Sequence, residues 1–154
     1  MVLSDSRATV EIGDGPELKS YQELVDRLEL KDYVIFHGIK EGKELDEIFR
    51  EADVGVGSLG LHRIGLSEAS PLKHREYAVR GLIILHGGED AEIDETQSIL
   101  IPKSSVQLQD VIDQYIEKSS KGNKNDFSAL SKKKYGWKVR IEAILSVVEL
   151  TEVS

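Results

Sequence analysis

The sequence contains no cysteine, so disulfide bonds and zinc sites built from thiolates are excluded, and a reducing compartment fits. It also contains no apolar run near the roughly 20 residues that a membrane-spanning helix needs, and its first residues do not form an apolar signal segment. We therefore expect a soluble cytoplasmic protein.

Basic residues are in the minority, with 20 Lys and Arg against 28 Asp and Glu and a formal net charge of −8. Nucleic acids and anionic membranes bind basic faces, so no nucleic-acid partner is expected. The run Lys132-Lys133-Lys134 is a local exception. A solvated surface is the favoured interpretation of this run, and peripheral contact with the inner face of an anionic membrane is the alternative.

Short apolar segments alternate with amphipathic segments about every 20 to 25 residues. We expect strands at residues 8–12, 33–36, 53–57, 82–85 and 99–101. Helical stripes at steps of three and four contain Leu18, Tyr21, Leu24, Val25 and Leu28; Leu45, Ile48, Phe49 and Ala52; and Leu108, Val111, Ile112, Tyr115 and Ile116. Strands that are apolar throughout are typical of a parallel sheet covered on both faces. The sequence thus predicts an α/β, Rossmann-like fold.

The length predicts one domain over residues 1–154, with a core at about 8–118 and a C-terminal helical segment at about 126–150. Residues 119–125 are predicted to be a polar linker. The apolar positions of the last helix are Trp137, Ile141, Ile144, Leu145 and Val148. Trp137 is expected to anchor this helix in the core.

Ligands of open α/β sheets bind at the carboxyl ends of the strands, which here precede loops at residues 13–16, 37–40, 58–73 and 86–90. The third loop follows Gly57 and contains Gly60 and Gly65. It leads into a helix for which Ser70 is the predicted cap, Pro71 the first position and Gly81 the end. Four Lys or Arg residues against two Glu make this region locally basic. An anion at the helix N-terminus is the expected ligand.

Several short motifs occur in an order and spacing that together are specific. They are Gly13-Asp14-Gly15-Pro16-Glu17, Ala52-Asp53-Val54, Pro71-Leu72-Lys73, Glu76-Tyr77-Ala78 and Gly81, with Glu68 and Glu76 separated by seven residues. This combination resembles the C-terminal domain of retaining GT-B glycosyltransferases of the family-four type, over nearly the whole chain.

The resemblance implies roles for individual residues. Glu76 would accept hydrogen bonds from the ribose hydroxyls of a nucleoside-diphosphate sugar, and Glu68, the candidate catalytic residue, would lie against the transferred sugar. The segment with Ser70 and Leu72 would contact sugar hydroxyls through its backbone, although Pro71 lacks one N–H donor. Lys73 is a candidate diphosphate contact.

The remaining donor contacts implied by the resemblance lie in two other loops. His37 and Gly38 match the wall around the base, and Gly13 and Gly15 belong to the neighbouring loop. The nucleotide sugar is a co-substrate, and no cofactor or metal is expected. Charge on the departing diphosphate would be stabilised by cations and helix N-terminal amides.

The family's domain normally begins with one further strand and helix, for which this sequence has no match. That strand is central in the usual order, so three arrangements stay open: strands two and four pair directly, another copy supplies an edge, or residues 1–7 partly fill the gap. An unpaired apolar edge favours association, and the sequence slightly favours a homodimer. The family's N-terminal acceptor domain is also absent, so we expect this chain alone to be inactive.

Two other classes of function remain as alternatives. One is a non-catalytic α/β ligand-binding or protein-interaction module, and the other is an epimerase or phosphorylase that shares the GT-B architecture. His37, His62, His74 and His86 are too scattered for metal-ligand spacing, so structural or surface roles are favoured for them. Lys73 and Arg75, taken alone, would be surface charges.

Overall fold

The computed structural model describes residues 2–4, 9–11, 13–101, 108–135 and 141. The strands are β1 (Val2–Ser4), β2 (Thr9–Glu11), β3 (Val34–Phe36), β4 (Ala52–Val56), β5 (Ile83–His86) and β6 (Ser98–Leu100). The α-helices are α1 (Leu18–Arg27), α2 (Gly42–Glu51), α3 (Leu72–Val79), α4 (Leu108–Ser120) and α5 (Lys124–Tyr135), and η1 (Leu61–Ile64) and η2 (Glu95–Gln97) are short 3₁₀ helices.

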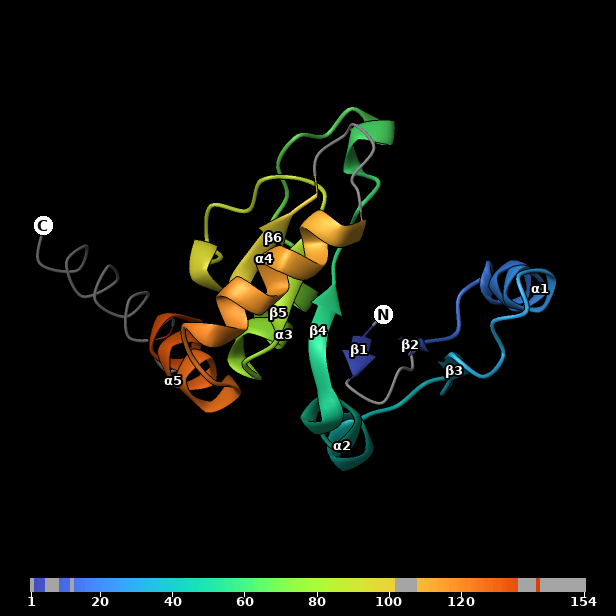
Figure 1. The fold of residues 1–154 in the computed structure, drawn as a ribbon, viewed down its shortest axis with the longest axis horizontal. Helices are drawn as coiled ribbons and strands as arrows, with labels where there is room; N and C mark the ends of the chain where they lie inside the picture. Colours follow the sequence, from blue (N-terminus) through green and yellow to red (C-terminus); the bar gives the residue numbers. More distant parts are fainter. Residues whose placement is uncertain (1, 5–8, 12, 102–107, 136–140, 142–154) are drawn as a thin grey trace, which may run out of the picture.

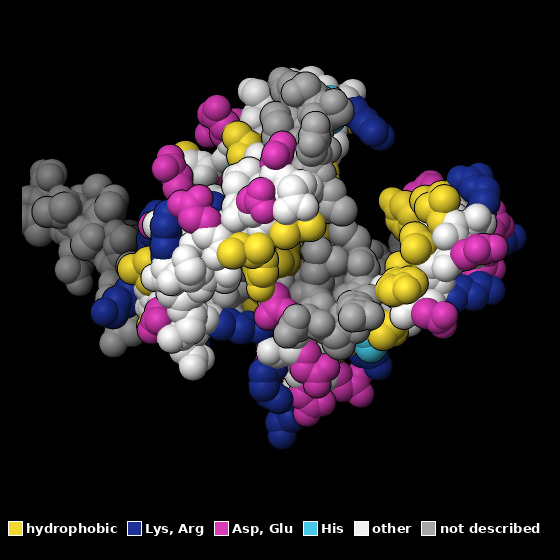
Figure 2. Space-filling view, viewed as in Figure 1, with side chains coloured by type: hydrophobic (Ala, Val, Ile, Leu, Met, Phe, Trp, Pro, Cys, Tyr) yellow, Lys and Arg dark blue, Asp and Glu magenta, His cyan; other side chains and the backbone are white. Residues whose placement is uncertain are grey.

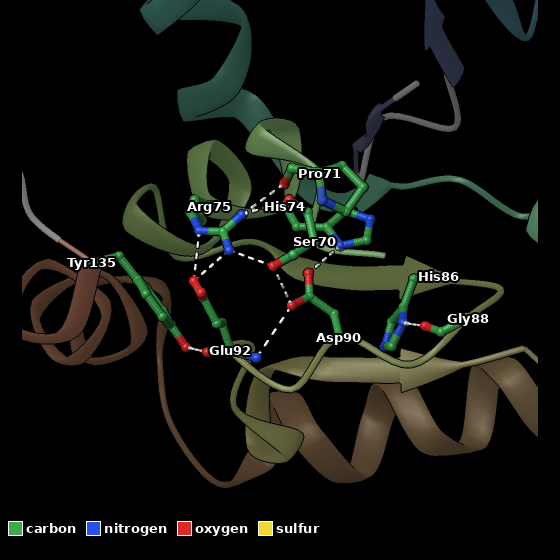
Figure 3. Close-up of polar contacts among 9 residues, drawn as sticks. All are labelled: Ser70, Pro71, His74, Arg75, His86, Gly88, Asp90, Glu92 and Tyr135. Atoms are coloured by element: carbon green, nitrogen blue, oxygen red, sulfur yellow. Dashed lines mark hydrogen bonds and ion pairs between the residues drawn. The ribbon is translucent and has the colours of Figure 1, made fainter. Parts of the chain in front are cut away.

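The strands form one sheet in the order β3-β2-β1-β4-β5-β6. The pairs β2–β3, β4–β5 and β5–β6 are parallel. Helix α3 packs on β4 and β5, and α4 packs on β5 and β6 from the opposite face of the sheet (Figures 1 and 3). The predicted Rossmann-like α/β fold is therefore confirmed.

The sheet differs from the prediction at its centre, where β1 is antiparallel to both β2 and β4. Val2 pairs with Val10 and Gly55, so residues 2–4 fill the expected gap. Only residues 5–8 separate β1 from β2. A connection this short permits antiparallel pairing, whereas a parallel pair needs a crossover of a dozen or more residues. The gap that favoured a homodimer is occupied, and the dimer itself stays a prediction.

The hydrophobic core lies between β4, β5 and the helices α2, α3 and α5. It consists of Phe49, Ala52, Tyr77, Ala78, Leu82, Ile84, Ile93 and Tyr135. The ring of Tyr77 meets that of Phe49 edge to face, at 5.8 Å between centroids. The predicted burial of residues 82–85 agrees with this core, because Leu82 and Ile84 are fully buried.

Helix α5 docks where α3 ends. Gly81 has a φ of +79° and ends α3 as predicted, and a Cβ atom there would lie 1.9 Å from the carbonyl oxygen of Lys124. The Lys124 ammonium donates to the carbonyl oxygens of Phe49 and Arg50 at 2.7 and 2.8 Å, at the end of α2. A cation in this position complements the negative end of the helix. Burial lowers the pKa of Lys124.

The apolar stripe of α1 forms as predicted, but it is not covered. No residue of α1 is buried, and Tyr21 is 51% exposed. Ile35 in β3 is 46% exposed, so the prediction that residues 33–36 form a buried strand is wrong about burial. Figure 2 shows hydrophobic side chains gathered over this part of the molecule. The strand forms because β2 pairs with it, not because helices cover it.

The predicted C-terminal helical segment is described in part. Helix α5 begins at Lys124, so the predicted linker shortens to residues 121–123. Trp137, Ile144, Leu145 and Val148 lie outside the described residues. Among the helices that the structure describes, none has the length and apolar character to cross a bilayer.

Gly55 allows α3 to approach β4. A Cβ atom at this position would lie 2.4 Å from two ring atoms of Tyr77, so Gly55→Ala should lower the free energy of unfolding by about 1 to 3 kcal/mol, the usual cost of overpacking a core. Urea unfolding measures this change. Gly60→Ala is the matched control, because its nearest neighbour would be Arg63 Cδ at 3.8 Å, and an equal loss in both variants would contradict the packing explanation.

Candidate functional site

The structure brings together the loops that follow β2 and β3. The Gly13 N–H donates to the Gly38 carbonyl at 2.9 Å, and both glycines have positive φ, at +140° and +65°. His37 is half-buried beside this contact. An open hollow of about 480 Å³ is lined by residues 13–18 and Tyr21. The predicted base-contacting residues therefore share one end of the sheet.

The loop after β4 lies across the carboxyl end of β5 and is fixed there by its backbone. Gly57 N–H donates to the Leu85 carbonyl at 2.7 Å, and Gly87 N–H donates to the Ser58 carbonyl at 3.0 Å. A Cβ atom on Gly87 would lie 2.4 Å from the Leu59 carbonyl oxygen. The glycine after β5 thus lets the two loops touch.

Glu68 lies in this contact. It forms a parallel bridge with Glu89, which lies just beyond the carboxyl end of β5. The Glu89 N–H donates to the Ser67 carbonyl at 2.9 Å, and the Ala69 N–H donates to the Glu89 carbonyl at 3.0 Å. The residue itself is exposed. Its backbone is thus held on both sides while its side chain remains accessible.

Glu76 lies in the second turn of α3 with a side chain that is 53% exposed. Its carboxylate is 3.8 Å from the Arg80 guanidinium, which also donates to Asp46 of α2 at 2.8 Å. Leu72, at the start of α3, is 75% exposed, and Lys73 is half-buried. Neither glutamate lines the hollow beside Tyr21.

The predicted start of the third helix is shifted by one residue. Pro71 is the N-cap, α3 begins at Leu72, and no side chain caps the helix. The Ser70 hydroxyl instead donates to Asp90 Oδ1 at 2.9 Å. The prediction that Ser70 caps the helix is therefore wrong, because Pro71 occupies the N-cap position and the Ser70 hydroxyl oxygen accepts from the Arg75 guanidinium.

A buried hydrogen-bond network connects α3 with the segment after β5 (Figure 3). His74 Nδ1 lies 2.9 Å from Asp90 Oδ2, and the two side chains are 1% and 0% exposed. The Glu92 N–H donates to Asp90 Oδ1 at 3.2 Å. Asp90 thus accepts hydrogen bonds from Ser70, His74 and the Glu92 backbone, as a buried carboxylate requires.

Arg75 forms a second connection beside this network. Its guanidinium donates to the backbone carbonyls of Ser70 and Pro71 at 2.9 and 3.3 Å, and its Nε donates to Glu92 at 2.9 Å. The Tyr135 hydroxyl of α5 donates to the Glu92 carbonyl. The side chain of Arg75 is only 12% exposed, so the prediction of a surface charge is wrong for this residue.

Two histidines contact each other under the loop. The rings of His74 and His86 meet edge to face at 5.6 Å between centroids, and His86 Nδ1 donates to the Gly88 carbonyl at 2.6 Å. The Nε2 atoms of both rings are buried and have no hydrogen-bond partner among the described residues. A Cβ atom on Gly57 would lie 2.1 Å from His74 Nε2. Gly57 is therefore needed at this position, because any side chain there would collide with the His74 imidazole.

Burial determines the charge of this network. It lowers the pKa of His74 below its ordinary value of 6.5, and the hydrogen bond to Asp90 offsets this effect only in part. For Asp90, burial acts to raise the pKa, but the hydrogen bonds from His74, Ser70 and the Glu92 backbone together keep it below 3.8. At neutral pH the arrangement is a neutral imidazole beside a carboxylate.

Sequence reasoning missed Asp90 and His74 as partners. His74 was one of four scattered histidines, and Asp90 was only the end of a loop. A separation of 16 residues is not a local pattern. The one available sign was the position of Asp90 after an apolar strand, at the edge where ligands and buried polar groups gather.

Comparison with known proteins supports the fold. No protein-family model matches the chain, and no curated protein matches it. The chain is similar to the crystal structure of the pneumococcal O-GlcNAc transferase GtfA in complex with UDP and GlcNAc, with a TM-score of 0.53 and 22% identity. The match covers 90% of this chain and 29% of that structure's chain. At this identity the likeness shows a shared fold.

The depressed pKa of His74 predicts that acidification destabilises the protein. The unfolded chain gains a proton on this residue near pH 6.5, whereas the folded protein resists it. The contribution of His74 to the free energy of unfolding should therefore be complete above pH 6.5. Below pH 6.5 the free energy of unfolding should decrease by up to about 1.4 kcal/mol per pH unit for this one group. Urea unfolding between pH 7.5 and 5.0 measures the slope of the free energy of unfolding against pH.

The slope should be smaller in His74→Asn, because asparagine retains a donor but cannot titrate. The control is His62→Asn, which removes an exposed histidine of η1 and should leave the slope as in the wild type. Equal slopes in the wild type and in His74→Asn would contradict the assignment.

Proposed function

We propose that this chain is the donor-binding domain of a retaining glycosyltransferase of the family-four type, which transfers a sugar from a nucleoside-diphosphate sugar to an acceptor. The observation that supports it is the parallel bridge between Glu68 and Glu89, which holds Glu68 just beyond the carboxyl end of β5, with Glu76 in the helix that follows. The likeness in fold to an O-GlcNAc transferase crystallised with UDP and GlcNAc supports it.

Glu76 would bind the ribose of the donor. Its carboxylate is largely exposed, and its contact with Arg80 at 3.8 Å is a weak surface pair. A fixed carboxylate can accept from two adjacent hydroxyls at once. Glu76 therefore remains available for a ligand without disturbing the fold.

Glu68 would lie against the transferred sugar. The bridge to Glu89 fixes its backbone, and α3 begins four residues later with Leu72. The segment from Ser70 to Leu72 would contact sugar hydroxyls through its backbone, with Pro71 unable to donate. Helix N-termini favour anions, so the start of α3 and Lys73 would receive the diphosphate.

The base would lie on the other side, at the loops with Gly13, Gly15, His37 and Gly38. The hydrogen bond between Gly13 and Gly38 joins these loops, and the hollow of about 480 Å³ is beside them. The volume is within the usual range of small-molecule sites. The donor would thus extend across the carboxyl edge of the sheet, which is where ligands of open α/β sheets bind.

The chemistry would depend on stabilising charge on the departing diphosphate, by cations and helix N-terminal amides and without a metal or other cofactor. Retention through a double displacement would need a carboxylate close to the anomeric carbon. An acceptor domain would close the site, so the chain alone is expected to be inactive.

The proposal also includes a cytoplasmic location, peripheral membrane contact through exposed residues 132–134 and a homodimer.

Calorimetric titration with UDP, GDP and ADP tests the proposal, with UDP first because it is present in the similar structure. Binding by the full-length protein, with weak or no binding by this chain, is the expected result. Absence of binding in both would favour a non-catalytic module. Conversion of a nucleotide sugar to its epimer without transfer would favour a GT-B-fold epimerase.

Glu76→Ala in the full-length protein should cost about 2 to 4 kcal/mol of donor binding or transition-state stabilisation, on the scale of losing a pair of charge-assisted hydrogen bonds. The ratio kcat/KM for the nucleotide sugar measures this cost. Glu47→Ala, an exposed position in α2, is the control and should behave as the wild type. Wild-type turnover in Glu76→Ala would refute the ribose role.

A further inference from the structure

We propose that Asp90 is a positioning residue for the transfer reaction, and that it acts with His74 to fix the loop on which Glu68 lies. The inference rests on the proposed function and adds two residues that have no part in donor binding. It follows from three sets of contacts around the carboxyl end of β5.

The first set aligns the backbone. The Glu89 N–H donates to the Ser67 carbonyl at 2.9 Å and the Ala69 N–H donates to the Glu89 carbonyl at 3.0 Å. These bonds surround Glu68 on both sides. The position of the Glu68 backbone therefore depends on the position of Glu89.

The second set fixes Glu89 through the next residue. Asp90 Oδ1 accepts from the Ser70 hydroxyl at 2.9 Å, and Asp90 Oδ2 lies 2.9 Å from His74 Nδ1. Ser70 follows Glu68 by two residues, and His74 belongs to α3. A single buried carboxylate therefore joins the loop, the helix and the end of β5.

The third set fixes the proton on His74. A carboxylate can only accept, so Nδ1 must be the donor and Nε2 is left without a proton. Nε2 faces Gly57 so closely that a Cβ atom there would lie 2.1 Å away, and no residue in the described part of the chain forms a hydrogen bond with it. A proton on Nε2 would lack an acceptor. The imidazole is thus confined to the tautomer that donates to Asp90.

This arrangement predicts a specific kinetic effect. The clamp, meaning Asp90 with Ser70 and His74, determines where Glu68 lies. It borders the proposed sugar and diphosphate contacts at the start of α3, whereas Glu76 and the base-contacting loops lie outside it. Loosening it should reduce the rate of sugar transfer by a larger factor than it weakens nucleotide binding. Misplacing a catalytic group by about 1 Å can reduce the rate by roughly 100-fold.

The test compares Asp90→Asn, His74→Asn and His74→Leu in the full-length protein. Release of UDP from UDP-N-acetylglucosamine gives kcat, and calorimetry gives the Kd of UDP. We expect kcat to fall roughly 10- to 100-fold in Asp90→Asn and His74→Leu, with a smaller change in the Kd of UDP. His74→Asn, which keeps a donor near the position of Nδ1, should restore much of kcat.

Amide hydrogen exchange tests the clamp independently of activity. The N–H groups of Ala69 and Glu89 should exchange faster in Asp90→Asn than in the wild type, because their mutual alignment is weakened. Ser131→Ala is the matched control. It removes a buried hydrogen bond to Gln97 of 2.7 Å that lies away from the loop, so it should lower Tm and leave kcat and these two amides unchanged.

Each outcome decides one claim. Unchanged exchange at Ala69 and Glu89 in Asp90→Asn would overturn the clamp. Faster exchange with wild-type kcat, or an equal loss of kcat in Ser131→Ala, would overturn the positioning role. If the wild-type protein neither binds UDP nor releases it from the sugar nucleotide, the transfer assignment fails, and the exchange experiment still decides whether Asp90 holds the loop.

Discussion

The buried carboxylate of Asp90 is the constraint on which this end of the molecule depends. An ionised carboxylate without partners would cost several kcal/mol at such a depth, and here a hydroxyl, an imidazole and a backbone N–H supply the donors. These donors come from the loop, from α3 and from the segment after β5. The hydrogen bonds to the Asp90 carboxylate therefore determine how the loop, α3 and the segment after β5 lie relative to one another.

Much of the fold could be predicted because its causes are local. Apolar runs at residues 53–57 and 82–85 become strands of the covered part of the sheet, and Gly81 ends α3 because a residue there must adopt a positive φ. The direction of β1 could not be predicted, because it depends on which strands pair in the folded protein. Burial of Ile35 was also mispredicted, because an apolar residue does not reveal whether anything covers it.

A site on the loop and helix after β4 was predicted from the spacing of Glu68 and Glu76, whose roles in it stay predictions. The contacts beneath it were not, since Ser70 and Asp90 are 20 residues apart and only the tertiary structure joins them. Gly57 illustrates the difference. The sequence suggests a flexible ligand loop, whereas the structure shows that the missing side chain leaves room for His74.

The three residues of β1 affect how far apart the two ends of the proposed donor site lie. Within the described sheet, β2 and β3 connect to β4, β5 and β6 through this strand, and its register shifts between Leu3 and Ser4. The base would rest on one side of this junction and the sugar on the other. The distance between the proposed base and sugar sites therefore depends on the few backbone hydrogen bonds of β1.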